Sequence, residues 1–264
     1  MITLLTVGYL LLGIFAGLLS GLLGIGGGLI VVPGLVFLVL HTPIPHPLIM
    51  HMAVATSLAT MILTSIRALE QHILRKITFW EVFRRLLPGI IAGTVLGAVL
   101  AIFLNTRVLE ILFGLFVLFI SIRLLIPKEF KGRHQLPGNF GMTIAGLLVG
   151  AKSGLLGVGG GALTIPFLTY CNIPIRNAVV VSAATSLTVA IIGTLTFMIS
   201  GYNDAELPSW STGFIYWPAA LPIMISSVIF TPLGVKLSHY LPATILSKIL
   251  GVFLLIVSFQ MLWN

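Results

Sequence analysis

The chain carries very little charge. Asp, Glu, Lys and Arg make up 8% of its 264 residues, none of them occurs before Arg67, and hydrophobic residues account for 58%. A transmembrane helix needs about 20 consecutive apolar residues, so the uncharged N-terminal stretch alone is long enough for about three crossings. This composition excludes a water-soluble globular core and predicts an all-α polytopic membrane protein.

Acidic residues and cysteines are also scarce. The six Asp and Glu residues all fall in loops or at the ends of apolar segments, which leaves no buried carboxylate pair for acid–base catalysis or a proton relay. The single cysteine, Cys171, cannot form an internal disulfide. His41, His46 and His51 lie close in sequence, but prolines flank His46 and no carboxylate joins them. We therefore expect no enzyme activity, no metal and no cofactor.

The chain contains a long internal duplication. Gly17–Pro33 reads GLLSGLLGIGGGLIVVP and recurs, glycine for glycine, as GAKSGLLGVGGGALTIP over Gly150–Pro166. An Ala-Thr-Ser-Leu sequence follows each copy, at Ala55 and again at Ala184. Each unit is far longer than a solenoid repeat, so the sequence predicts two halves, 1–134 and 135–264, that together form one transmembrane domain.

Two apolar segments are too long for a single crossing. As one helix, segment 3–40 would extend about 57 Å, against a hydrocarbon core of about 30 Å, and segment 139–170 would extend about 48 Å. Each carries its glycine cluster near the middle, where glycine favours a break. Each half is therefore predicted to begin with a broken or re-entrant helical hairpin, followed by three transmembrane helices. Those six helices are expected over segments 47–66, 86–104, 108–126, 177–199, 213–235 and 243–262.

The basic residues favour hairpins over single crossings. If both broken segments turn back, twelve Lys and Arg residues share one side of the membrane and Arg107 alone lies on the other, whereas single crossings give nine against four. The positive-inside rule then places both termini outside and gives the halves opposite orientations, as inverted-topology repeats. Most of the net charge of +8 serves topology in this arrangement and does not indicate a nucleic-acid partner.

Inverted repeats with discontinuous helices are typical of secondary transporters. Broken helix ends present unpaired N–H groups and a partial positive charge, so they bind anions without a charged side chain. An alternative is that the glycines only allow close packing between membrane helices.

The twin motifs resemble those of the sulfite exporter TauE/SafE family. The resemblance rests on Gly21–Gly28 with Pro33 and on Gly154–Gly161 with Pro166, each followed by an Ala-Thr-Ser-Leu helix, and it covers the whole chain. It implies a plasma-membrane transporter that moves small sulfur-containing or organic anions such as sulfite, sulfoacetate or related sulfonates. Its partners would be that substrate and the lipid bilayer, with a homo-oligomer possible.

The residues around the two clusters form the candidate substrate site. Lys152 takes the place of Leu19 of the first half. It lies about 13 residues, or roughly 20 Å along a helix, from the start of its segment, and a lysine at that depth in a membrane is a functional candidate. Alternatively, a tilted segment would let its side chain reach the cytoplasmic surface. Paired hydroxyls could donate to an oxyanion, or could instead bond neighbouring carbonyls. The full set is Gly24, Gly26, Gly27, Gly28, Gly157, Gly159, Gly160, Gly161, Ser20, Ser153, Thr56, Ser57, Thr185, Ser186 and Lys152.

Two other functions use the same features. An anion channel would differ from a transporter only in its flux rate and its lack of saturation. A membrane subunit or maturation factor for a partner enzyme would need a docking surface, and the only sizeable soluble segments are 67–85 and 123–138. Secondary transport by alternating access at a midplane site between the two breaks explains the duplication and the paired breaks most directly.

Overall fold

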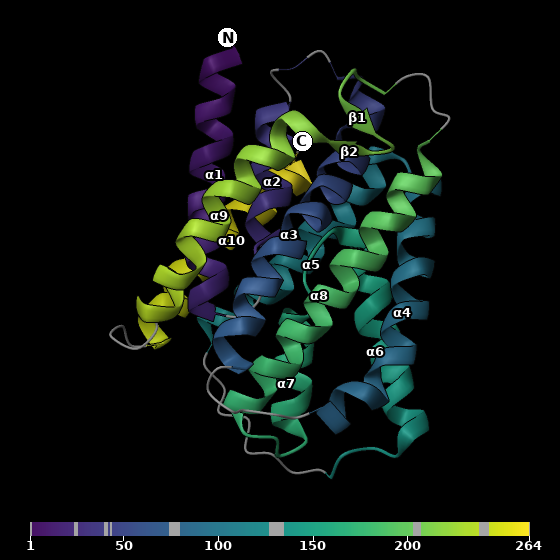
Figure 1. Cartoon of the computed structure of the whole chain (residues 1–264), viewed down its shortest axis with the longest axis vertical. Helices are drawn as coiled ribbons and strands as arrows, with labels where there is room; N and C mark the ends of the chain where they lie inside the picture. Colours follow the sequence, from purple (N-terminus) through teal and green to yellow (C-terminus); the bar gives the residue numbers. More distant parts are fainter. Residues whose placement is uncertain are drawn as a thin grey trace.

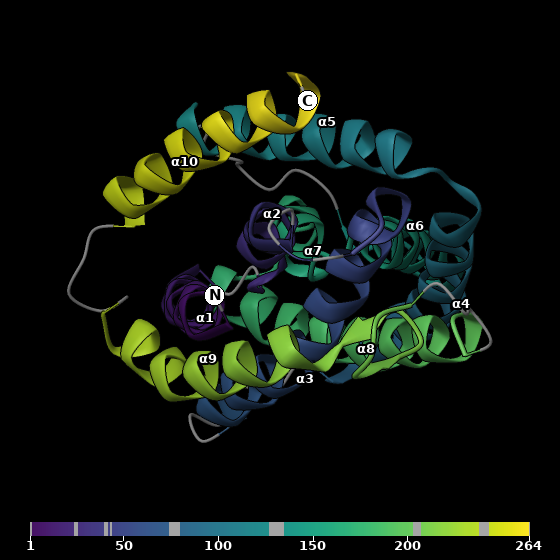
Figure 2. The same cartoon turned by 90° about the horizontal axis from the view of Figure 1, so that it is seen from above.

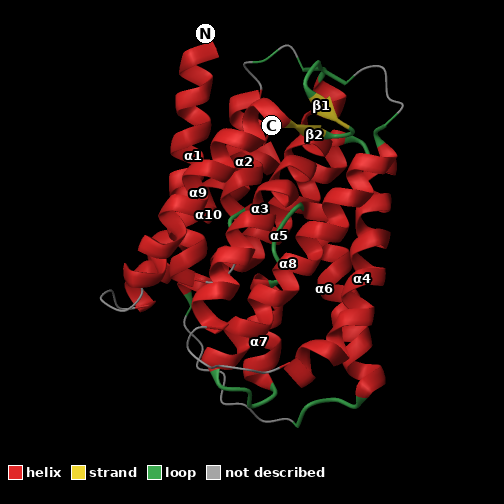
Figure 3. Cartoon of the chain, viewed as in Figure 1, coloured by secondary structure: helices red, strands yellow, loops and turns green. Residues whose placement is uncertain are grey.

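The computed structural model is a bundle of helices with one small β-hairpin (Figures 1 and 3). It describes residues 2–23, 26–39, 42, 44–73, 80–126, 135–202, 207–237 and 243–263. The elements are α1 (Ile2–Leu23), α2 (Gly28–Val39), η1 (His46–Leu48), α3 (Ile49–Ile73), α4 (Trp80–Phe103), α5 (Thr106–Leu125), α6 (Asn139–Leu156), α7 (Gly161–Tyr170), α8 (Ile175–Ser200), β1 (Ser211–Thr212), β2 (Ile215–Tyr216), α9 (Trp217–Leu237) and α10 (Ala243–Trp263).

Seven helices in the described part of the chain are long and apolar enough to cross a membrane. They are α1, α3, α4, α5, α6, α8 and α9, and α10 adds a shorter apolar helix. Large hydrophobic side chains are exposed along these helices, which suits contact with lipid rather than with water. The prediction of an all-α polytopic membrane protein is confirmed.

Both overlong apolar segments are broken at their glycine clusters. The first helix of the chain ends at Leu23, and α2 starts at Gly28, while α6 ends at Leu156 and α7 starts at Gly161. Gly157 closes α6 in a left-handed conformation with φ of 67°, which a residue with a side chain rarely adopts. The second arms, α2 and α7, have 12 and 10 residues, too few to span a bilayer. Both lie in the centre of the bundle when it is seen from above (Figure 2).

Glycine stripes hold the long helices close together. Helix α4 packs along α6, and a Cβ added to Gly93 would lie only 2.1 Å from the carbonyl oxygen of Leu147. Helix α1 packs along α9 in the same way, with Gly17 against the backbone of Ser227. Small residues allow this backbone approach and are the usual means of packing helices in lipid.

The main helix pairs are preserved when each element is exchanged for its counterpart in the other half. Pair α4–α6 becomes pair α9–α1, and the pairs α5–α10 and α3–α8 are each exchanged with themselves. Two equivalent halves related by a two-fold axis would produce this pattern. In Figure 1, α1 starts at the upper end of the bundle, whereas its counterpart α6 starts at the lower end. The inverted orientation of the halves in a membrane stays a prediction.

One end of the bundle gathers several segments that are distant in sequence. His51, near the start of α3, places Nε2 2.9 Å from the carbonyl oxygen of Leu104, and its ring lies 5.8 Å from that of Phe214 in the β-hairpin. At the same end, Arg107 donates to the carbonyl oxygen of Leu262 near the end of α10, at 3.0 Å. The N-terminus of α1 also lies towards this end (Figure 1). Leu38, near the end of α2, packs against Gly8, near the start of α1, so both ends of the α1–α2 unit lie on one side, as a hairpin requires.

Candidate functional site

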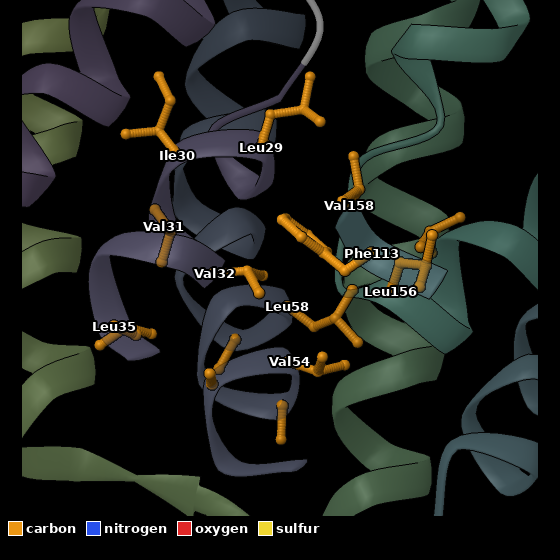
Figure 4. Packing of buried hydrophobic residues seen from close by; sticks show 14 of the residues in the cluster. Leu29, Ile30, Val31, Val32, Leu35, Val54, Leu58, Phe113, Leu156 and Val158 are labelled. Carbon is orange, nitrogen blue, oxygen red and sulfur yellow. The ribbon is translucent and has the colours of Figure 1, made fainter. Parts of the chain in front are cut away.

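The two helix breaks meet inside the bundle. A Cβ added to Gly26 would lie 3.3 Å from Cα of Gly159, and one added to Gly28 would lie 2.3 Å from the carbonyl oxygen of Gly157. Apolar side chains surround this contact, among them Val54 and Leu58 of α3, Phe113 of α5 and Val158 (Figure 4). The structure thus brings the two glycine clusters together, and in this conformation their backbones touch.

The glycines of the clusters have different neighbours. Gly26 has a left-handed φ of 82° and lies against Met61, as does Gly28. A Cβ added to Gly160 would lie 2.4 Å from the methyl carbon of Thr185. A Cβ added to Gly27 would have more room, since its nearest atom would be 3.3 Å away. Gly24 is outside the described residues. Gly161 is the first residue of α7 and is buried.

Two of the three first-half hydroxyls, those of Thr56 and Ser57, are bonded to protein groups. Ser57 donates to the carbonyl oxygen of Gly157 at 2.9 Å, which ties α3 to the second break. Thr56 accepts a hydrogen bond of 3.1 Å from the backbone N–H of Tyr216 in the β-hairpin. Ser20 is buried on α1.

The second-half hydroxyls are different. Ser153, Thr185 and Ser186 are 0%, 0% and 2% exposed, and within the described part of the structure their hydroxyl oxygens have no hydrogen-bond partner. A buried polar group without a partner costs about 1–3 kcal/mol, so such groups call for an explanation. Thr56 and Ser57, the counterparts of Thr185 and Ser186, show that the protein can bond hydroxyls at these two positions.

Lys152 points at the second break. Its ammonium nitrogen lies 3.4 Å from the carbonyl oxygen of Gly159 and 4.5 Å from the centroid of the Phe116 ring on α5. The side chain is partly buried and is directed away from Asn139, where α6 begins, so it does not reach back to that end of the bundle. None of the ion pairs between described residues includes Lys152; those pairs are Arg67–Glu70, Arg85–Glu81 and Arg107–Glu110.

A β-hairpin covers the first-half hydroxyls from one end. Phe214 and Ile215 are 5% and 0% exposed, and Phe214 packs edge-on against Phe197 of α8. Because Tyr216 bonds Thr56 two turns into α3, the hairpin enters the bundle instead of lying on its surface.

Sequence reasoning missed two contributors. Phe116 supplies the ring under Lys152, and nothing in the pattern of α5 distinguishes it from the other apolar residues of that helix. Thr164, on α7 one turn after Gly160, is 1% exposed and has a hydroxyl without a hydrogen bond among the described residues. The repeat contained a signal for Thr164, because the equivalent position in the first half is Val31.

Comparison with known proteins now assigns the family. The model of the family described as sulfite exporter TauE/SafE matches residues 9–262. The chain belongs to this family. A probable membrane transporter protein of Haemophilus influenzae is 32% identical over 253 residues, covering 96% of each chain. Similar proteins described in the same words are 27% identical in Methanocaldococcus jannaschii, over 92% of this chain and 91% of the relative, and 25% identical in Bacillus subtilis, over 96% of both. No solved structure gives a significant match.

Membership of the TauE/SafE family confirms the resemblance read from the twin glycine motifs and identifies a multi-pass membrane transporter. Transport implies a small-molecule substrate and a lipid environment. The relatives' names state no substrate.

Proposed function

We propose that the protein is a secondary transporter that exports small sulfur-containing or organic anions, such as sulfite, sulfoacetate or related sulfonates. Transport occurs by alternating access at the two helix breaks. The protein lies in the plasma membrane with both termini outside, and a homo-oligomer is compatible with its apolar exterior. The protein binds this small anion without a metal or cofactor.

The observation that carries the proposal is that Lys152 has no acidic partner among the described residues. A lysine within a membrane-spanning helix costs a few kcal/mol and is normally paired. The ammonium group of Lys152 interacts with a carbonyl oxygen and an aromatic ring, and no acidic residue of the described chain pairs with it. An anionic substrate would supply the missing counter-charge.

The surroundings of Lys152 support the same reading. The first N–H groups of α7 have no acceptor within their own helix, and the positive end of the helix dipole lies at Gly161. Because the glycine backbones touch, a substrate requires the breaks to part, which suits alternating access better than a permanently open pore.

A cavity elsewhere in the bundle supports an anion site less well. It has a volume of about 510 Å³ and lies at the start of α5, lined by Val36, His46, Pro47, Asn105, Thr106, Arg107 and Glu110. The charge of Arg107 is already matched there, by Glu110 at 3.6 Å and by the carbonyl oxygens of Met261 and Leu262. This cavity lacks the free positive charge that Lys152 provides.

Counterflow in proteoliposomes tests the proposal. Vesicles loaded with unlabelled sulfite, thiosulfate, sulfoacetate, taurine or a simple carboxylate are diluted into the same labelled compound. Transient accumulation of label with at least one sulfur-containing anion is expected. Flux without counterflow would indicate a channel, and no flux with any of them would contradict the proposal. In a parallel thermal-shift screen, a ligand at 100 times its Kd adds about 2.7 kcal/mol of stability.

A further inference from the structure

We propose that the two halves divide the work of the site. The second half binds the anion, through Thr185, Ser186 and Ser153 beside the N-terminus of α7. The first half does not bind it, because Thr56 and Ser57 instead fasten the hairpin and the second break in place. This inference rests on the proposed function and replaces the symmetric site that the repeated sequence suggests.

The first-half hydroxyls are engaged with protein groups in this conformation. Ser57 uses its only O–H on Gly157, and Thr56 accepts the N–H of Tyr216. Both side chains are buried, at 0% and 1% exposure. Each bond joins residues at least 100 positions apart. We call Thr56 and Ser57 latches, because they fasten helix α3 to the β-hairpin and to the second break, which would have to move during transport.

The second-half hydroxyls retain their full capacity. Thr185 and Ser186 occupy the same repeat positions as Thr56 and Ser57, and they are equally buried, yet neither is bonded within the described structure. Ser153 at the end of α6 shares this state. Three buried O–H donors without acceptors are suited to a group that brings its own oxygen acceptors, as an oxyanion does.

Thr185 and Ser153 lie on helix faces beside the start of α7. A Cβ added to Gly160, the residue before α7, would lie 2.4 Å from the methyl carbon of Thr185 and 3.4 Å from a methyl carbon of Val149 on α6. Because residues four apart share a helix face, Ser153 lies one turn beyond Val149 on that same face. Leu163 and Thr164 bond the carbonyl oxygen of Gly160, which leaves the N–H groups of Gly161 and Ala162 at the start of α7, near the residues of α6 and α8 that carry unbonded hydroxyls.

Sequence differences between the repeats point in the same direction. Over the matched motifs, Leu19 of the first half is replaced by Lys152, and Val31 by Thr164. Both changes add polarity to the second half, beside a break whose glycines are otherwise identical. Lys152 also contacts the carbonyl oxygen of Gly159 within the same break. The charge and the unbonded donors therefore occur together around α7.

Equivalent positions of the repeat provide matched variants, Thr56→Val with Thr185→Val and Ser57→Ala with Ser186→Ala. The first test uses the purified full-length protein in detergent without added anion. Thr56→Val and Ser57→Ala should lower the Tm, since each breaks a bond that exists, while Thr185→Val and Ser186→Ala should leave the Tm unchanged or raise it. Thr56→Ser keeps the acceptor and should restore the Tm. Equal losses of Tm in both halves would overturn the division of roles.

The second test adds the anion of the panel that stabilises the wild type most. The Kd should rise about tenfold or more in Thr185→Val and in Ser186→Ala, because each loses a hydrogen bond to a charged group. The first-half variants should keep the anion-induced rise in Tm. A loss of affinity confined to Thr56→Val and Ser57→Ala would reverse the assignment. If no anion stabilises the wild type, the proposed function and the anion-binding role fall, and the anion-free comparison still decides whether the latches exist.

Discussion

The ammonium nitrogen of Lys152 lies 4.5 Å from the centroid of the Phe116 ring. A cation over an aromatic face is stabilised by about 0.5–2 kcal/mol, depending on how far it is desolvated. The ring holds the charge beside the second break without neutralising it, as a carboxylate would. An anion arriving at this position therefore meets a cation whose charge is still available.

Removal of the Lys152 charge should weaken substrate binding. Lys152→Ala is expected to raise the Kd for the transported anion about tenfold or more, since interactions with a charged group contribute about 1.5–3 kcal/mol. Lys152→Arg should lose less, and Phe116→Leu should have a smaller effect in the same direction. Lys236→Ala, which removes an exposed lysine in the last turn of α9, is the control and should bind like the wild type. Equal affinity in Lys152→Ala would remove the lysine from the site.

Neighbouring glycines of the first break should respond very differently to alanine. A Cβ at position 28 would lie 2.3 Å from the Gly157 carbonyl oxygen, a rigid backbone atom, whereas at position 27 the nearest atom is the Ala16 Cβ at 3.3 Å. Gly28→Ala should therefore lower the Tm and abolish transport, while Gly27→Ala keeps most of both. Leucine at position 27 or 160 should abolish transport while the protein still reaches the membrane. Normal transport by Gly28→Ala would show that the contact between the breaks is dispensable.

Membrane sidedness can be tested at two exposed positions. In a Cys171→Ser background, Ser209→Cys in the loop that carries the β-hairpin should react with an impermeant maleimide from outside the cell. Gln135→Cys, before α6, should react only after the membrane is permeabilised. The expectation follows from the twelve-to-one distribution of basic residues. Labelling of both cysteines from the same side would contradict the hairpin topology.

Membrane potential alone should drive export. The described chain has no acidic residue at the breaks that could relay protons or bind sodium, and each negative charge gains about 2.3 kcal/mol per 100 mV when it leaves a cell with a negative interior. In proteoliposomes, a potassium potential imposed with valinomycin should accelerate anion flux towards the positive side. Flux that follows a pH gradient and ignores the potential would favour proton coupling instead, with His51 as the first residue to test.

Local sequence was sufficient for the helices and their breaks. Apolar length predicts which segments are helices, and the six unbroken helices lie within a few residues of their expected positions except α3, which continues to Ile73, and α4, which begins at Trp80. The glycine clusters mark both breaks because an overlong apolar segment cannot stay in the bilayer as one helix, and glycine is where it leaves the helix most easily. The same repeated motifs also identify the family.

Only the tertiary structure distinguishes the two halves of the site. Ser57 and Ser186 are equivalent in the repeat, and any reading of the sequence assigns them the same role, yet one bonds Gly157 and the other is unbonded among the described residues. The bond between Thr56 and Tyr216 joins residues 160 positions apart. Hydropathy and glycine spacing act over a few turns of one helix, so they determine where helices form. The partner of a buried hydroxyl depends on which distant backbone group packs against it, and that is decided when the helices assemble.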